Sequence, residues 1–264
     1  MVYSSKQAIL VASFGTSYEE TRRKTIDVIE KTISRAFPDY EVRRAFTSNH
    51  IIKKLRTRDQ MIVHTVSEAL NALHRDGFDT VTIQPTHIIN GEEYEKIVNE
   101  ATQFEGHFHS LRISRPLLTN TQDYHQVIAA IINDFPALDD DHALILMGHG
   151  TTHFSNASYA ALDYMFKEQG HHNVFVGTVE AYPAIDIILK QIQTLGSTKV
   201  ILAPLMLVAG DHIINDMAGA DDGSWRSACE QVGLEVTCIL KGLAENPQIR
   251  DIYLAHLRDV LGNQ

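Results

Sequence analysis

The chain alternates short apolar runs with longer amphipathic stretches. The apolar runs are rich in Val, Ile and Leu and do not alternate cleanly with polar residues. This pattern is typical of strands that are buried on both faces of a mostly parallel sheet. The predicted strands cover residues 8–13, 40–46, 80–84, 110–113, 143–147, 173–178, 199–203 and 235–239.

Between these runs, apolar residues recur with the period of a helix. The regular order of strand, helix and strand predicts right-handed βαβ units and therefore an α/β fold. The predicted helices cover residues 19–36, 62–75, 92–104, 120–133, 157–168, 184–195 and 247–261.

The predicted strands form two groups of four, and the sequence breaks between the groups. Residues 135–141 begin with Phe-Pro and end in three aspartates. Such a polar, proline-containing segment favours a boundary between two structural units. We therefore predict an N-terminal α/β half at residues 1–136 and a C-terminal α/β half at residues 137–264.

The two halves also resemble one another in sequence. Residues 10–16 align with residues 145–151, and residues 84–93 align with residues 203–212. These matches indicate an internal duplication. We expect two similar halves, each a four-stranded, mainly parallel sheet flanked by helices, that face each other across a cleft, where ligands usually bind.

Three residues of the second half form a candidate metal site. His149, Glu180 and His212 each follow a predicted strand, at spacings of 31 and 32 residues. Because each spacing is close to one βα unit, the three lie beyond the carboxyl ends of successive parallel strands, where open α/β sheets bind ligands. Two imidazoles and one carboxylate suit a divalent metal ion and leave coordination positions open. We call these residues the His–Glu–His trio.

Each member of the trio also has an ordinary structural interpretation. A histidine is more often a surface or core residue than a ligand, Glu180 suits the start of a helix, and His212 could cap one. The matched spacing favours the metal site. The sequence HGTTH that starts at His149 lacks the Glu of a zinc protease motif, so we interpret His153 as a loop residue.

Composition and charge limit the kinds of partner that we expect the chain to bind. The chain has 264 residues and a net charge of −10, which argues against nucleic acid or an anionic membrane as the main partner. No apolar run approaches about 20 residues and the N-terminus lacks the features of a signal peptide, so we expect no membrane span and a cytoplasmic location. Cys229 and Cys238 are too few for a disulfide scaffold, and we expect both to be buried.

Two further groups of residues have alternative interpretations. The apolar loop 205–209 and its counterpart 86–90 could enclose a flat hydrophobic ligand or simply complete the core. A basic group could bind ligand carboxylates or form an exposed helical face. It consists of Arg43, Arg44, Lys53, Lys54 and Arg56.

Specific motifs run along almost the whole chain. They are SFGTSYEET (13–21), RAFTSNHIIKKLRTRD (44–59), HIINGEEYEKIV (87–98), MGHGTTH (147–153), VEAYP (179–183), PLMLVAGDHIINDMAGADDGSW (204–225) and GLAENPQIR (242–250). At these residues the chain resembles the anaerobic cobalt chelatases of the CbiK type, which act on sirohydrochlorin in cobalamin (vitamin B12) synthesis. They belong to the class II chelatases, which share a two-halved α/β fold.

The resemblance implies roles for the trio. The family binds its metal through the histidine of MGHG, the glutamate of VE-x-YP and the histidine of AGDH, which here are His149, Glu180 and His212. It also implies that these residues are catalytic, that Co²⁺ is the substrate metal, that no organic cofactor is needed, and that the last helix packs on the N-terminal half. The ligand types alone also suit Fe²⁺, Ni²⁺ and Zn²⁺.

Other functions stay open at this point. The chain could be an iron chelatase for sirohaem or haem, or a tetrapyrrole or haem carrier on the same fold, although a carrier needs at most two axial ligands. A metal-dependent hydrolase would need a further acid or base and a polar pocket. The sequence leaves open whether the chain forms a homo-oligomer, and whether Asp216, Asp221 and Asp222 contact a ligand or cap helices.

Overall fold

The computed structural model describes residues 6–135, 138–139 and 141–262. It divides into two compact units. The first unit contains the described residues up to Thr119 and from Arg250 onward, and the second contains Asn120–Ile249. The boundary predicted between residues 136 and 137 lies outside the described residues. Among the described residues, no helix is both long and apolar enough to cross a lipid bilayer.

The first unit is built on a parallel sheet with the strand order β2-β1-β3-β4. Its strands are β1 (Gln7–Ser13), β2 (Glu41–Phe46), β3 (Thr80–Pro85) and β4 (Ser110–Ile113). Its helices are α1 (Glu19–Lys24), α2 (Ile26–Ala36), α3 (Asn49–Asp59), α4 (Val66–Arg75), α5 (Glu92–Thr102) and α10 (Pro247–Leu261), of which α10 begins in the second unit.

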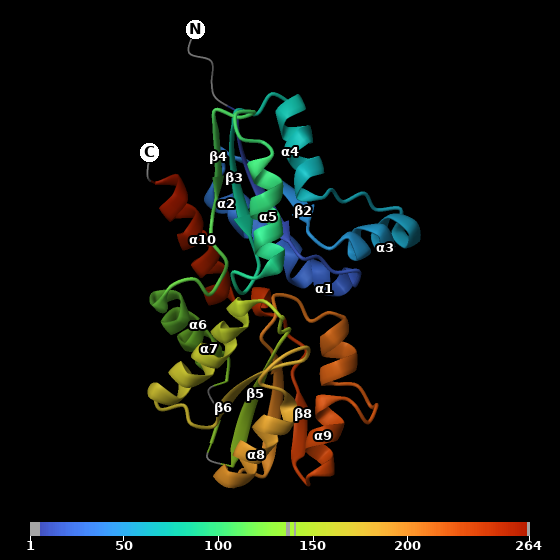
Figure 1. Cartoon of the computed structure of the whole chain (residues 1–264), viewed down its shortest axis with the longest axis vertical. Coiled ribbons are helices and arrows are strands. Elements are labelled where there is room, and N and C mark those ends of the chain that lie inside the picture. Colours follow the sequence, from blue (N-terminus) through green and yellow to red (C-terminus); the bar gives the residue numbers. More distant parts are fainter. Residues whose placement is uncertain (1–5, 136–137, 140, 263–264) are drawn as a thin grey trace. The chain divides into compact units, whose positions relative to one another are not determined.

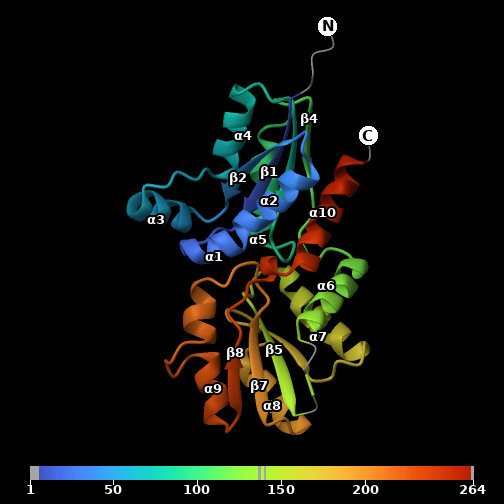
Figure 2. The same ribbon diagram turned by 180° about the vertical axis from the view of Figure 1, so that it is seen from behind.

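Helices cover both faces of this sheet (Figures 1 and 2). Apolar side chains of α4 and α5 bury one face, against alternate strand residues such as Leu10 and Ile83. On the opposite face lie α2 and α10. The buried Tyr253 of α10 donates a hydrogen bond from its hydroxyl to the Thr86 carbonyl, at 2.9 Å. The last helix of the chain therefore completes the unit that the chain began.

The second unit repeats the same topology, with the strand order β6-β5-β7-β8 and all strands parallel. Its strands are β5 (His142–Gly148), β6 (Val174–Thr178), β7 (Lys199–Pro204) and β8 (Glu235–Cys238). Its helical elements are α6 (Thr121–Asp134), η1 (Phe154–Asn156), α7 (Ala157–Glu168), α8 (Ile185–Leu195), the π-helical turn η2 (Ile213–Met217), α9 (Trp225–Gln231) and η3 (Leu243–Glu245).

The core of the second unit also lies on both faces of its sheet. Ile145 and Met147 of β5 pack with side chains of α8 and α9, including Ile192 and Trp225. Because side chains alternate along a strand, Leu146 points to the opposite face, which α6 and α7 cover. The predicted α/β fold with two four-stranded sheets is confirmed.

Backbone hydrogen bonds at the strand ends match between the units. In the first unit the Ser48 N–H donates to the Phe14 carbonyl, at 3.2 Å, and in the second the Glu180 N–H donates to the His149 carbonyl, at 2.9 Å. The two units therefore share their chain path as far as the loops that follow their strands. Equivalent bonds at the ends of β3 and β7 run from Thr86 to Ala12 and from Leu205 to Met147.

Some predicted helices were wrong in detail. The single helix predicted at residues 19–36 is broken at Thr25, where φ is −121° and ψ is −83°. No range was predicted for the helix α3, although an exposed helical face was one interpretation of its basic residues. It buries only Ile52 and Leu55 and so has a weak apolar pattern. Helix α4 begins at Val66 rather than residue 62, since Thr65 forms a capping box with Glu68.

Candidate metal centre

The trio gathers at one edge of the second sheet. His149 directly follows β5 and Glu180 follows the neighbouring β6. His212 lies just before η2, in the helical segment that begins at Asp211 after β7, on the other side of β5. Because β5 is the central strand of these three, the two histidines and the glutamate converge beyond its carboxyl end. This is the position that the βα spacing predicts.

The distances between the three side chains suit a small cation. One potential ligand atom from each residue lies within 4.8 Å of the others. Glu180 has one carboxylate oxygen near each histidine, with Oε2 at 3.6 Å from His149 Nδ1 and Oε1 at 3.7 Å from His212 Nε2. The imidazole rings meet edge to face, with centroids 4.7 Å apart. A divalent ion can therefore bind these three groups with little movement of their side chains.

All three side chains are accessible from outside the second unit. Their exposed fractions are 42% for His149, 53% for Glu180 and 32% for His212. A structural zinc site encloses its metal with four protein ligands, whereas three accessible ligands leave coordination positions for another molecule. The arrangement can hold a metal ion and pass it on.

The loop after β5 fixes the backbone at His149. Gly150 has φ of +85°, and a Cβ atom there would lie 2.9 Å from the Ala181 nitrogen. A side chain at residue 150 would therefore force apart the two loops that carry His149 and Glu180. The His149 Nδ1 lies 2.9 Å from the Gly150 carbonyl oxygen, which suits an Nδ1–H donor. Beneath this loop, burial raises the pKa of Tyr159 to about 12.

A fourth side chain, Asp216, whose role the sequence left open, contacts the trio. The Asp216 Oδ2 lies 2.6 Å from His212 Nδ1. The two residues are four positions apart within one helical segment, so their side chains share a face. The signal in the sequence was this spacing, which is informative only once a helix is known to begin before His212.

Other candidate residues have local roles. His153 caps η1 by accepting a hydrogen bond from the Ser155 N–H on its Nδ1. Arg44 of the basic group is paired with Asp27 and Glu30 of α2, and burial raises the pKa of Glu30 despite this pairing. The remaining basic residues are placed in β2 (Arg43, paired with Glu41 and Asp76) and in α3 (Lys53, Lys54 and Arg56).

The apolar loop 205–209 completes the core in large part. Leu205, Leu207 and Ala209 are buried, and Met206 packs against the same core. The cysteines fit the expectation only in part, because Cys229 is buried whereas Cys238 is partly exposed.

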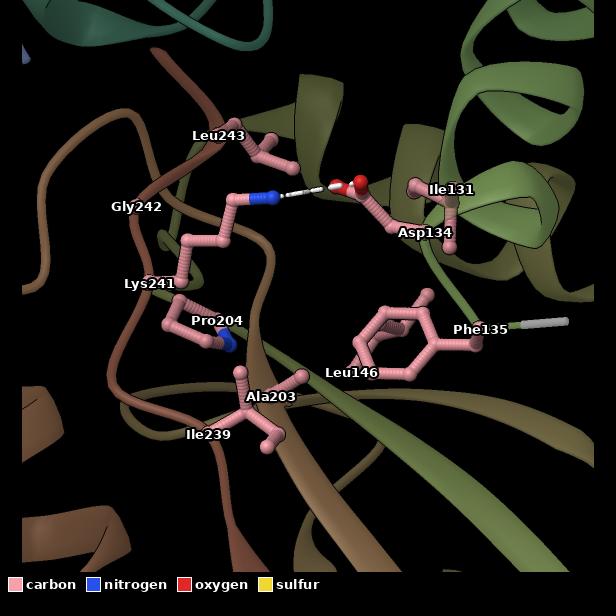
Figure 3. Close-up of a pocket in the computed structure, with 10 residues that line it drawn as sticks. All are labelled: Ile131, Asp134, Phe135, Leu146, Ala203, Pro204, Ile239, Lys241, Gly242 and Leu243. Carbon is pink, nitrogen blue, oxygen red and sulfur yellow. Dashed lines mark hydrogen bonds and ion pairs between the residues drawn. The ribbon is translucent and has the colours of Figure 1, made fainter. Parts of the chain in front are cut away.

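A cavity of about 160 Å³ in the second unit lies apart from the trio (Figure 3). Lys241 and Asp134 form an ion pair across it, with N–O distances of 3.1 and 3.2 Å. Asn246 also donates to Asp134, at 2.9 Å. These contacts tie the segment after β8 to α6. The lining residues are Ile131, Asp134, Phe135, Leu146, Ala203, Pro204, Ile239, Lys241, Gly242 and Leu243.

Comparison with known proteins shows the family to which the chain belongs. It is 44% identical to the sirohydrochlorin cobaltochelatase of Salmonella typhimurium, over 97% of both chains. It is 34% identical to the sirohydrochlorin cobaltochelatase CbiKC of Nitratidesulfovibrio vulgaris, over 96% of this chain and 90% of that protein. The solved structure of SirB from Bacillus subtilis with Fe³⁺ shares the fold, with a TM-score of 0.65, 12% identity and coverage of 96% and 95%. The sequence model of the cobalt chelatase (CbiK) family matches residues 7–262, and the chain therefore belongs to that family.

Proposed function

We propose that this protein is a sirohydrochlorin cobaltochelatase, which inserts Co²⁺ into sirohydrochlorin during anaerobic cobalamin biosynthesis. Membership of the cobalt chelatase family supports this function. The observation that carries it is the convergence of His149, Glu180 and His212, whose potential ligand atoms lie within 4.8 Å of one another. In this proposal the trio binds the substrate metal and takes part in catalysis.

The reaction exchanges one metal ion for two protons. A free-base tetrapyrrole has two N–H groups, and both protons must leave as Co²⁺ binds the four ring nitrogens. Each protein ligand that releases the metal regains a lone pair, and a neutral imidazole or a carboxylate can then accept a proton. The trio can therefore supply the metal and remove the protons at the same place. Its carboxylate also offsets part of the charge of the ion.

The open coordination positions suit transfer of the metal ion to the tetrapyrrole rather than storage of the ion. Three accessible ligands hold the ion while its remaining positions carry water, and ring nitrogens can replace that water one at a time. A carrier of a finished metal–tetrapyrrole complex needs only axial ligands, so it has no use for a third protein group on the metal. The proposed substrates are Co²⁺ and sirohydrochlorin. We place the reaction in the cytoplasm, where two free thiols such as Cys229 and Cys238 persist.

The test is an anaerobic insertion assay with purified protein, sirohydrochlorin and Co²⁺, followed by the absorbance change on metallation. We expect protein-dependent insertion that is lost in His149→Ala and in His212→Ala. His172→Ala is the matched control, because this exposed histidine lies in the same unit but outside the trio. Its rate should equal that of the unmodified protein.

The same assay separates the alternatives. Faster insertion of Fe²⁺ than of Co²⁺ would favour an iron chelatase. Tight binding of the tetrapyrrole without acceleration for any metal would favour a carrier. Full activity in both histidine variants would show that the trio is not the metal site.

A further inference from the structure

The two nitrogens of the His212 ring have different neighbours. On one edge, Nε2 faces Glu180 Oε1, at 3.7 Å. On the other edge, Nδ1 lies 2.6 Å from Asp216 Oδ2. A carboxylate at this distance accepts a hydrogen bond, so the ring nitrogen next to it carries the proton. The opposite nitrogen then has its lone pair directed toward the metal position.

We propose that Asp216 is a positioning residue, which holds His212 in the tautomer and the orientation that present Nε2 to the substrate metal. This inference rests on the proposed function, because it assumes that the trio binds Co²⁺. Asp216 itself lies outside the group whose ligand atoms converge, which consists of His149, Glu180 and His212. It therefore acts on the metal through His212.

The local backbone explains how Asp216 reaches the ring. The helical segment begins at Asp211 and continues as the π-helical turn Ile213–Met217. In this turn the Ala218 N–H donates to the Ile213 carbonyl, at 3.1 Å, five residues back. Ile213 and Met217 are fully buried and anchor the turn in the core. The turn thus has a fixed place, and its polar face carries His212 and Asp216.

The carboxylate has two physical effects on His212. It removes the competing tautomer, in which Nε2 carries the proton and cannot bind a metal. It also makes the ring more electron-rich, which strengthens the bond from Nε2 to a cation. His149 is held differently, because its Nδ1 lies 2.9 Å from the neutral carbonyl oxygen of Gly150. We infer that His212 is the firmer of the two imidazole ligands.

The experiment measures Co²⁺ binding to the full-length protein without tetrapyrrole, by titration calorimetry and by the visible absorption of bound Co²⁺. The variants are Asp216→Ala, Asp216→Asn and the conservative Asp216→Glu. Asp222→Ala is the control, because it removes an exposed carboxylate from the same segment, six residues further on. We expect Asp216→Ala to raise the dissociation constant about 10- to 100-fold, with Asp216→Asn between it and the unmodified protein. Asp216→Glu should recover most of the affinity.

Two further readouts distinguish positioning from a merely structural role. Nitrogen NMR of the metal-free protein should show His212 protonated at Nδ1, and a mixture of tautomers in Asp216→Ala. In the insertion assay, the KM for Co²⁺ should rise while the KM for sirohydrochlorin stays the same. The unfolding temperature of the metal-free variant should change by less than about 4 °C, since one hydrogen bond between partly exposed side chains contributes little to stability.

The inference is overturned if Asp216→Ala binds Co²⁺ as tightly as the unmodified protein, or if Asp222→Ala weakens binding equally. His212→Ala is measured alongside. Loss of Co²⁺ binding in His212→Ala, with full binding in Asp216→Ala, rejects the role of Asp216 and leaves the proposed function intact. Full binding in His212→Ala rejects the metal site and the role of Asp216 together.

Discussion

At equivalent backbone positions, the carboxyl ends of the two sheets carry different side chains. The hydrogen bond from Ser48 to Phe14 in the first unit corresponds to the bond from Glu180 to His149 in the second. The sequence alignment pairs Glu93 with His212 in the same way. One unit therefore has Phe, Ser and Glu where the other has His, Glu and His. The shared fold sets the positions, and under the proposed function these three differences between the units explain why the second unit binds the metal ion.

The sheet edge of the first unit is occupied by polar groups that bond to one another. Thr86 donates a hydrogen bond from its hydroxyl to the Ser13 hydroxyl, at 2.9 Å. Lys96 donates to the Thr47 carbonyl. Loss of hydration, together with nearby Lys96, lowers the pKa of His87 to about 4. This partly buried histidine is therefore neutral near pH 7.

The largest expected effect is on Co²⁺ affinity, which should depend on Glu180 but not on its counterpart Ser48. Glu180→Gln removes a charged ligand, so Co²⁺ affinity should fall by more than the roughly 100-fold that loss of an outer-sphere partner costs. Ser48→Ala should leave Co²⁺ affinity unchanged. It should lower the free energy of unfolding by about 1 kcal/mol, because Ser48 caps α3 by accepting the Ile51 N–H. Calorimetry and urea unfolding measure both quantities, and similar Co²⁺ affinities in the two variants would contradict the comparison.

The second effect is a loss of stability at acidic pH, which His87 causes. The unfolded chain binds a proton at this residue below about pH 6.5, whereas the folded protein does so only below about pH 4. Stability should therefore decline as the pH falls from about 6.5 to about 4, by up to about 3 kcal/mol from this residue. In His87→Gln that part of the pH dependence should vanish. Urea unfolding at several pH values checks this, and parallel curves for both proteins would refute it.

The smallest effect compares two glycines at matched positions. Gly15 and Gly150 have φ of +101° and +85°, and both lack room for a Cβ atom. Alanine at either position should cost about 1–2 kcal/mol of stability. Only Gly150→Ala should also weaken Co²⁺ binding, because residue 150 separates the loops of His149 and Glu180. Equal Co²⁺ affinity in the two variants would show that the loop spacing in the second unit does not matter.

Much of the architecture could be predicted from the sequence. Buried parallel strands produce continuous apolar runs, so all eight predicted strands are present with small differences at their ends. The convergence of His149, Glu180 and His212 followed from spacings close to one βα unit. The bounds of helix α3 were not predicted, because most of its side chains contact solvent and solvent-exposed helices leave a weak apolar signal.

The contact between Asp216 and His212 could not be predicted. It depends on where the helical segment begins and on the π-helical turn that follows, and such ends are set by local packing of residues like Ile213 and Met217. Likewise, the sequence does not show whether Arg44 binds a ligand or a carboxylate of the protein. In the structure it pairs with Asp27 and Glu30. Sequence spacing identifies side chains that can lie near one another. Which of them form contacts is determined by the folded structure.

Helix α10 has a consequence for synthesis of the protein. Its residues from Arg250 onward belong to the first unit, although the whole second unit lies between them and Thr119. Tyr253 and Leu257, both fully buried, reach that unit only after the rest of the chain has been translated. Since domains fold as their residues leave the ribosome, the second unit can finish before the first. A chain that stops at residue 249 would leave α2 alone on one face of the first sheet, so a truncation after the second unit would damage the first.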